Sequence, residues 1–192
     1  MIRRGLYWAT LSCFVIASGV LNIVQARRIS QLSVQLDEVS QPGRDSLRAG
    51  VEIRSLSLRS QSGASIAVRL DDSTRDTALY IFRPGCHWCI KNAAAIKELS
   101  SLERGKCRMV GVSTSGDGLA AYVSEYGPDF ETYGVASAET AAQLKLSATP
   151  QLIVVGSNGR VKRVWTGAFS GGTRDGIENY FSVRLKSNVS GD

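Results

Sequence analysis

A predicted buried strand that leads directly into a pair of cysteines constrains this chain more than any other feature. Residues Ala78–Phe82 form a continuous apolar run, which is the pattern of a strand covered on both faces. Pro84–Gly85 ends the strand, and a helical pattern begins at Cys86 and ends before Gly105. Cys86 and Cys89 are therefore expected in the first turn of a helix that follows a central strand.

The start of a helix favours a thiolate, because unpaired backbone N–H groups and the helix dipole stabilise negative charge there. The pKa of a cysteine thiol falls from about 8.5 into the range ~3.5–7.5 in such settings. The thiolate is the attacking species in thiol–disulfide exchange. We therefore expect Cys86 to be an exposed nucleophile and Cys89, one turn deeper, to resolve the mixed disulfide. The Cys86–Cys89 pair would be the redox centre, without any further cofactor.

Other uses of a CxxC pair need residues that this chain does not offer. Haem attachment requires a histidine after the second cysteine, and Ile90 is there. A structural zinc site requires four ligands, but beyond the pair the globular part has only Cys107 and His87. No metal is therefore expected. Cys107 begins a predicted strand and is interpreted as a buried structural thiol, and Cys13 lies in the apolar N-terminal segment.

His87 and Trp88 separate the two cysteines. As an imidazolium, His87 would stabilise the Cys86 thiolate and make the pair more oxidising, whereas as an exposed neutral spacer it would not. The sequence leaves both interpretations open. Trp88 is expected to contact protein substrates, because tryptophan often anchors interfaces, and shielding of the sulfurs is the alternative.

The N-terminal segment is expected to be a membrane anchor. Leu6–Val24 carries no charge and approaches the ~20 apolar residues that span a bilayer, and two arginines precede it. A cleaved signal peptide is the alternative. Its apolar core is usually only about 7–15 residues long, and two arginines would follow a cut after Ala26. We therefore expect an uncleaved anchor over residues 1–26 in the inner or cytoplasmic membrane, with the domain facing the periplasm or cell exterior.

A helical stalk and linker are expected over residues 27–50. The apolar positions Ile29, Leu32, Leu36 and Val39 form a short a/d seam. A helix that simply continues from the membrane is favoured over a dimerising coiled coil, because the seam covers fewer than two heptads. The globular domain then occupies residues 51–192.

The globular part alternates predicted strands with predicted helices. Strand–helix–strand units imply a parallel core sheet with helices on its faces, and hairpins add antiparallel strands, so the fold class is α/β with a mixed sheet. The expected hairpins pair Val51–Leu58 with Ala64–Leu70 and, across Asn158–Gly159, Leu152–Val155 with Val161–Trp165. The other expected elements are a strand at Met109–Val112 and helices at Leu119–Tyr126, at Ala138–Leu144 and around Ile177–Leu185.

The net charge of +6 is spread over the sequence rather than clustered. Such a charge favours an anionic membrane surface or an acidic partner. A nucleic-acid partner is not expected, since it would require a clustered basic face with stacking aromatics.

A second constellation, Thr149–Pro150, precedes the apolar strand that begins at Gln151. A proline that enters a central strand is confined to its first residue or to an edge. A cis bond in a tight turn is one reason to keep it there, and an ordinary trans turn is the alternative.

The strand–CxxC–helix order, followed by MVGVSTS and then LKLSATPQLIVVGSNGRVKRVWTG, resembles thioredoxin-fold proteins of the TlpA/ResA type. These are membrane-anchored thiol-disulfide oxidoreductases of bacterial cell envelopes. The resemblance covers about Val51–Leu185. It implies a thioredoxin fold with an N-terminal transmembrane helix, and disulfide exchange with extracytoplasmic protein thiols. The implied partners are protein thiols or disulfides and an upstream thiol-disulfide electron-transfer protein.

The resemblance also implies residue roles. Cys86 would attack and Cys89 would resolve. Pro150 would be cis and face the pair, and Thr149 would offer backbone hydrogen bonds to an extended substrate peptide.

Three positions depart from the pattern of that family, because Trp88 replaces a proline, Gly85 an aromatic residue and Asn92 a proton-handling glutamate. Tyr80 in addition stands near the position of the buried aspartate of thioredoxin itself. The direction of electron flow is therefore not predicted. Two other functions remain as alternatives, a peroxiredoxin-like peroxidase and a non-catalytic thioredoxin-fold binding module. The peroxidase would have threonine three residues before the nucleophile, where this chain has Arg83.

Overall fold

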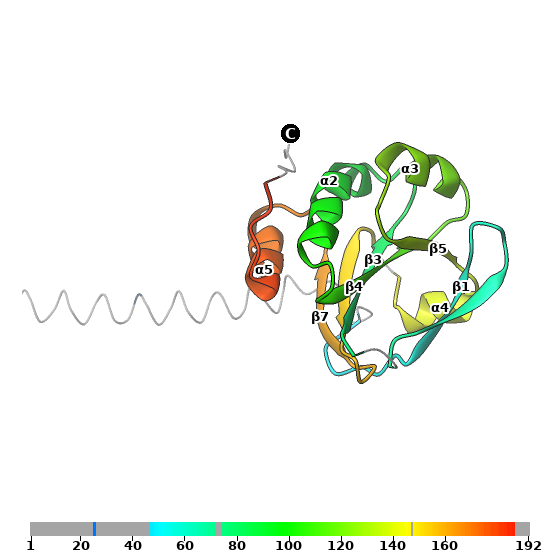
Figure 1. Cartoon of the computed structure of the whole chain (residues 1–192), viewed down its shortest axis with the longest axis horizontal. Coiled ribbons are helices and arrows are strands. Elements are labelled where there is room, and N and C mark those ends of the chain that lie inside the picture. The colour runs from blue at the N-terminus through cyan, green and yellow to red at the C-terminus, as the bar shows by residue number, and fades with distance from the viewer. Residues whose placement is uncertain (1–24, 26–46, 72–73, 147, 187–192) are drawn as a thin grey trace, which may run out of the picture. The chain divides into compact units, whose positions relative to one another are not determined.

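The computed structural model describes residues 25, 47–71, 74–146 and 148–186 (Figure 1). The predicted anchor at Leu6–Val24 and the seam of the predicted stalk lie outside these residues. Among the residues described, no helix has both the length and the apolar character to cross a membrane. The fold belongs to one unit, Asp45–Asp192.

A seven-stranded mixed sheet forms the centre of this unit, with strand order β2-β1-β5-β4-β3-β6-β7. Strands β3, β4 and β5 are parallel to one another, and all other neighbours are antiparallel. The strands are β1 (Ser55–Arg59), β2 (Ser65–Arg69), β3 (Asp76–Phe82), β4 (Cys107–Ser113), β5 (Glu131–Val135), β6 (Gln151–Val155) and β7 (Val161–Thr166). The helices are α2 (His87–Leu102), α3 (Leu119–Tyr126), α4 (Ala138–Gln143) and α5 (Gly171–Phe181).

The side chains of alternate residues of β3 point to opposite faces of the sheet. Tyr80 and Phe82 belong to the buried cluster that includes residues of α2, α3 and α5. Leu79 and Ile81 belong to the cluster on the opposite face, which includes Leu144 at the end of α4 (Figure 1). This burial on both faces confirms that the apolar run is a central strand.

Most of the predicted elements are present, and three differ. The closing helix was expected around Ile177–Leu185 but runs over Gly171–Phe181, so it begins at the glycine pair and ends before Leu185. The first strand begins at Ser55 rather than at Val51. Strand β5, Glu131–Val135, was not predicted, because it is short and only partly buried and contains Gly134. It pairs with β4 at a point where Gly111 faces Thr132, and a β-carbon on Gly111 would lie 2.8 Å from the Thr132 hydroxyl oxygen.

The junction between β3 and α2 depends on a glycine. Gly85 has φ +78°, a backbone conformation that side chains other than glycine rarely adopt. This requirement explains why glycine, and not an aromatic residue, precedes the first cysteine here.

Candidate active site

Cys86 is the N-cap of α2, as the sequence predicted. Its φ and ψ are −73° and 118°, and its Sγ accepts a hydrogen bond from the backbone N–H of Cys89 at 3.4 Å. This is the geometry of a helix cap, with sulfur in place of the usual side-chain oxygen. Both cysteines are free thiols. The structure thus brings the two sulfurs together at the start of the helix.

The expectation that Cys86 is exposed is wrong. Cys86 is only 9% exposed and Cys89 is fully buried. The Cys86 thiol is covered because it faces the Thr149 main chain, which lies 63 residues away in sequence. Any molecule that reacts with the Cys86 thiol must therefore approach this junction directly.

The two thiols have opposite acidities. Burial raises the pKa of Cys86, but hydrogen bonds from the Cys89 thiol and from the N–H groups of Cys89 and Trp88 outweigh it, so this pKa lies below its usual value. Burial, and then the hydrogen bond to Cys86, raise the pKa of Cys89. Cys86 is therefore the first of the pair to ionise, which favours it as the nucleophile.

The Thr149–Pro150 peptide bond is cis and lies beside the pair, as the family resemblance implies. The Cys86 thiol donates to the Thr149 carbonyl oxygen at 3.8 Å. That contact favours the protonated thiol, so the lowered pKa of Cys86 depends on the other hydrogen bonds, first the one from the Cys89 thiol and then those from the N–H groups. Pro150 is buried and Thr149 is half-buried. The main chain at Thr149 is thus placed where it can meet a peptide bound at Cys86.

His87 and Trp88 lie on the surface next to Cys86. Trp88 is 38% exposed. The His87 and Trp88 rings meet edge to face with centroids 5.2 Å apart, and the Lys91 ammonium lies 5.3 Å from the Trp88 ring. Trp88 therefore presents an aromatic surface beside the nucleophile, with a cation adjacent to it.

Asn92 has a role that the sequence did not suggest. It is fully buried on α2. Its amide Nδ2 donates to the Gly167 carbonyl at 3.4 Å, and its Oδ1 accepts the Phe169 N–H at 3.0 Å. Both partners lie more than 70 residues away in sequence, so no local pattern could have revealed them.

Two tyrosines beneath Cys89 were also not predicted as part of the site. The hydroxyls of Tyr80 and Tyr122 donate to the Cys89 carbonyl at 3.3 and 3.1 Å. Burial raises the pKa of both phenols above the usual value, so they remain neutral donors. Tyr80 therefore supplies a hydrogen bond at the position near which thioredoxin has a carboxylate.

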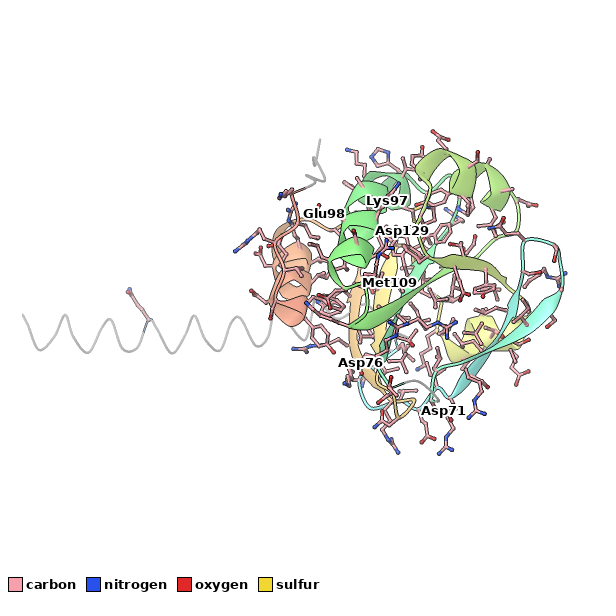
Figure 2. The ribbon with its side chains drawn as sticks, viewed as in Figure 1. Asp71, Asp76, Lys97, Glu98, Met109 and Asp129 are labelled. Carbon is pink, nitrogen blue, oxygen red and sulfur yellow. The ribbon has the colours of Figure 1, made fainter. Side chains whose placement is uncertain are left out.

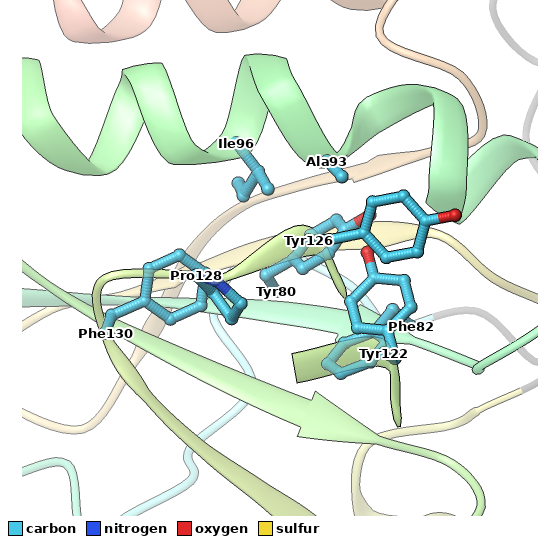
Figure 3. A pocket seen from close by; sticks show the side chains of 8 residues that line it. All are labelled: Tyr80, Phe82, Ala93, Ile96, Tyr122, Tyr126, Pro128 and Phe130. Carbon is cyan, nitrogen blue, oxygen red and sulfur yellow. The ribbon is translucent and has the colours of Figure 1, made fainter. Parts of the chain in front are cut away.

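The same two rings line a small cavity between α2 and the sheet (Figure 3). Its volume is about 10 Å³, close to the room that one water molecule needs. The figure shows the Tyr80 and Tyr122 oxygens close together below α2. The floor of the active site is thus aromatic, with polar atoms gathered under Cys89.

Cys107 lies at the opposite end of the sheet. It begins β4 and pairs in register with Asp76 at the start of β3, whereas the CxxC pair follows the end of β3. Figure 2 labels Asp76 at the lower edge of the sheet. Cys107 is 7% exposed, and burial, followed by the charge of Asp76, raises its pKa to about 11. The structure confirms that Cys107 is buried.

Within residues 47–71, 74–146 and 148–186, no group of three or more His, Cys, Asp or Glu side chains could hold a metal ion. The geometry at Cys86 and Cys89 is that of a dithiol.

No protein-family model and no curated protein sequence matches this chain. Solved structures do. A candidate thiol:disulfide interchange protein DsbE from Chlorobium tepidum matches with a TM-score of 0.60 and 14% identity over 71% of this chain and 98% of its own. The thioredoxin domain of a thiol-disulfide oxidoreductase from Bacteroides vulgatus matches with a TM-score of 0.57 and 15% identity over 71% and 99% of the two chains.

A peroxidoxin, BcpB from Mycobacterium tuberculosis, matches with a TM-score of 0.58 and 17% identity over 71% and 95% of the two chains. Likeness at such identities concerns the fold. Together with the mixed sheet, the flanking helices and the position of the CxxC pair, it shows that this chain has a thioredoxin-like α/β fold.

Proposed function

We propose that the protein is a thiol-disulfide oxidoreductase that exchanges disulfides with protein thiols through Cys86 and Cys89. One observation carries the proposal: two adjacent thiols of opposite acidity at the start of α2, with the nucleophile facing the Thr149 carbonyl. A thiolate that is stabilised where a substrate can approach, backed by a buried thiol, is what two-step disulfide exchange requires.

The first step is attack of the Cys86 thiolate on one sulfur of a substrate disulfide. The Cys86–substrate S–S bond forms and the substrate disulfide breaks, and its other sulfur leaves as a thiolate that takes up a proton. In the second step Cys89 loses its proton and attacks Cys86 Sγ. The Cys86–Cys89 bond forms, and the remaining substrate sulfur leaves as a thiol. The substrate gains the two electrons that the pair loses, and the reverse sequence oxidises a dithiol.

The surroundings of Cys86 support a protein rather than a small molecule as substrate. The exposed Trp88 ring offers an anchor near the nucleophile, and the Thr149 main chain lies against the Cys86 thiol. An extended peptide could therefore pair with Thr149 while its cysteine reaches Cys86.

The cellular setting completes the proposal. The apolar segment Leu6–Val24 would tether the domain to the inner or cytoplasmic membrane, facing the periplasm or cell exterior. The pair would then be kept reduced or oxidised by an upstream thiol-disulfide electron-transfer protein, and its reduction potential relative to that partner would set the direction.

Cysteine variants of the full chain test the proposal. We expect Cys86→Ser to abolish exchange with a disulfide-linked peptide, and Cys89→Ser to accumulate a mixed disulfide that mass spectrometry detects. The matched control is Cys107→Ala, which should exchange at the wild-type rate because Cys107 lies at the other end of the sheet. Full exchange by Cys86→Ser would exclude the proposal. Faster consumption of hydrogen peroxide than of the peptide disulfide would assign the pair to peroxidase chemistry instead.

A further inference from the structure

Asn92 connects the helix that carries the cysteines to the loop between β7 and α5. Its Nδ2 donates to the Gly167 carbonyl, and its Oδ1 accepts from the N–H of Phe169. Both polar atoms of this fully buried amide are thereby used. An apolar side chain of similar size would leave a carbonyl and an N–H of that loop without these partners, which is costly in a buried position.

Gly167 continues the connection to the substrate-facing segment. Its N–H donates to the Pro150 carbonyl at 2.8 Å. The preceding residue, Thr149, accepts the hydrogen bond of the Cys86 thiol. Since Cys86 and Asn92 both belong to the α2 region, the contacts form a closed ring of hydrogen bonds through Cys86, Thr149–Pro150, Gly167 and Asn92.

We propose that Asn92 is a positioning residue that holds the Thr149–Pro150 segment at the distance from Cys86 that an extended peptide needs. The inference rests on the proposed function. Asn92 does not touch the reacting sulfurs and has no proton to exchange, so its effect is geometric. A peptide uses both the thiol and the neighbouring main chain, whereas a small disulfide needs only the thiol. Asn92 therefore selects for peptide substrates over small ones.

The experiment compares two substrates with three variants of the full chain in detergent micelles. The substrates are a disulfide-linked peptide of about ten residues and bis(2-hydroxyethyl) disulfide. Asn92→Asp keeps the shape and the acceptor for Phe169 but loses the donor to Gly167, and Asn92→Ala loses both bonds. Ser100→Ala is the control, because Ser100 is also a buried polar residue of α2 but lies far along the helix from Cys86.

We expect kcat/KM for the peptide to fall about tenfold in Asn92→Asp, which loses one positioning hydrogen bond, and by at least as much in Asn92→Ala, which loses both. The value for the small disulfide should stay within about twofold, because that substrate makes no use of the positioned main chain. Ser100→Ala should leave the ratio of the two values unchanged. If Asn92→Ala does not fold, Asn92→Asp alone decides, because it preserves the volume of the side chain.

An equal fall for both substrates, or no fall for the peptide, would overturn the role of Asn92. Failure of the wild-type chain to exchange with either substrate would instead overturn the proposed function. The two failures are therefore distinguishable.

Discussion

The two ends of the sheet each hold a buried cysteine, and only one of them is prepared to react. Cys86 and Cys107 are 9% and 7% exposed, so solvent reaches them almost equally. Yet the pKa of Cys86 is lowered, while burial raises that of Cys107 to about 11. The difference comes from the hydrogen bonds that the Cys86 sulfur accepts, first from the Cys89 thiol and then from N–H groups at the start of α2. Burial raises the pKa of a thiol, and hydrogen bonds to its sulfur can reverse that effect.

Alkylation gives the largest expected contrast between these ends. At pH 7 a thiol with a pKa of about 11 has roughly 10⁻⁴ of its molecules ionised, and a pKa below 9 gives more than ~10⁻². We therefore expect iodoacetamide to modify Cys86 at least about a hundredfold faster than Cys107 in the folded chain. Mass spectrometry of time points measures both rates. Equal rates in the native protein would remove the contrast, and unfolding in urea should abolish it.

The stability of the protein at alkaline pH tests whether the pKa of Cys107 is raised in the folded chain. Well below the ordinary thiol pKa of about 8.5 to 9, Cys107 is protonated in both the folded and the unfolded chain, so its raised pKa does not affect stability. Above that pKa the unfolded chain loses the proton first, and stability falls until the folded thiol ionises near pH 11. Cys107 should thus contribute a loss of about 2 to 3 kcal/mol between these pH values.

Urea denaturation of wild-type and Cys107→Ala chains at pH 8, 9, 10 and 11 measures this loss. The variant should show a smaller decline in the free energy of unfolding, whatever its stability at pH 8. Parallel declines in the two proteins would show that Cys107 ionises normally in the fold.

The tyrosines beneath Cys89 sharpen the comparison, because their hydroxyls bind only at the end of the sheet that carries the CxxC pair. Each of Tyr80→Phe and Tyr122→Phe removes a buried hydrogen bond to the Cys89 carbonyl. We expect each to reduce the free energy of unfolding by about 1 kcal/mol without changing alkylation of Cys107. Tyr126→Phe is the control, since Tyr126 lines the same cavity. A loss as large in the control would show that the hydrogen bonds to the Cys89 carbonyl make no specific contribution.

The smallest effect is expected at the surface. Trp88→Ala should raise KM for a disulfide-linked peptide about two- to fivefold, because it removes one aromatic anchor at the rim of the site. Ile90→Ala is matched to it in exposure, at 36% against 38%, and should leave KM unchanged. Steady-state kinetics with peptides of varied length measures both. An effect of equal size in the two variants would mean that Trp88 has no specific role.

Local patterns predicted the central strand, the helix that begins at Cys86 and the Asn158–Gly159 hairpin. Each of these depends on neighbours in the sequence, on apolar runs and on turn residues. Strand β5 was not predicted because its position depends on pairing with β4, where the absence of a side chain at Gly111 leaves room for Thr132. A search for short alternating runs around Thr132 could have found it.

For the site too, the sequence predicted the local features and missed the contacts between distant segments. The cysteines were found from their position, but the burial of Cys86 was not, since the segment that covers it is distant in sequence. The partners of Asn92 and the convergence of Tyr80 and Tyr122 on Cys89 arise only when the chain has folded. A substitution relative to the resembled family marked Asn92 and Tyr80 as unusual, without indicating what they contact.

The Gly167–Pro150 hydrogen bond has a consequence for the choice of partners. Strands β6 and β7 pair in register from Gln151 and Thr166, and this bond adds one further rung beyond them. Thr149, whose carbonyl faces the Cys86 thiol, directly precedes this rung, and main chain recognises extended backbone irrespective of side-chain identity. Clients would then be distinguished by whether the segment around their cysteine is unfolded, so one protein could serve many sequences while sparing cysteines inside folded domains.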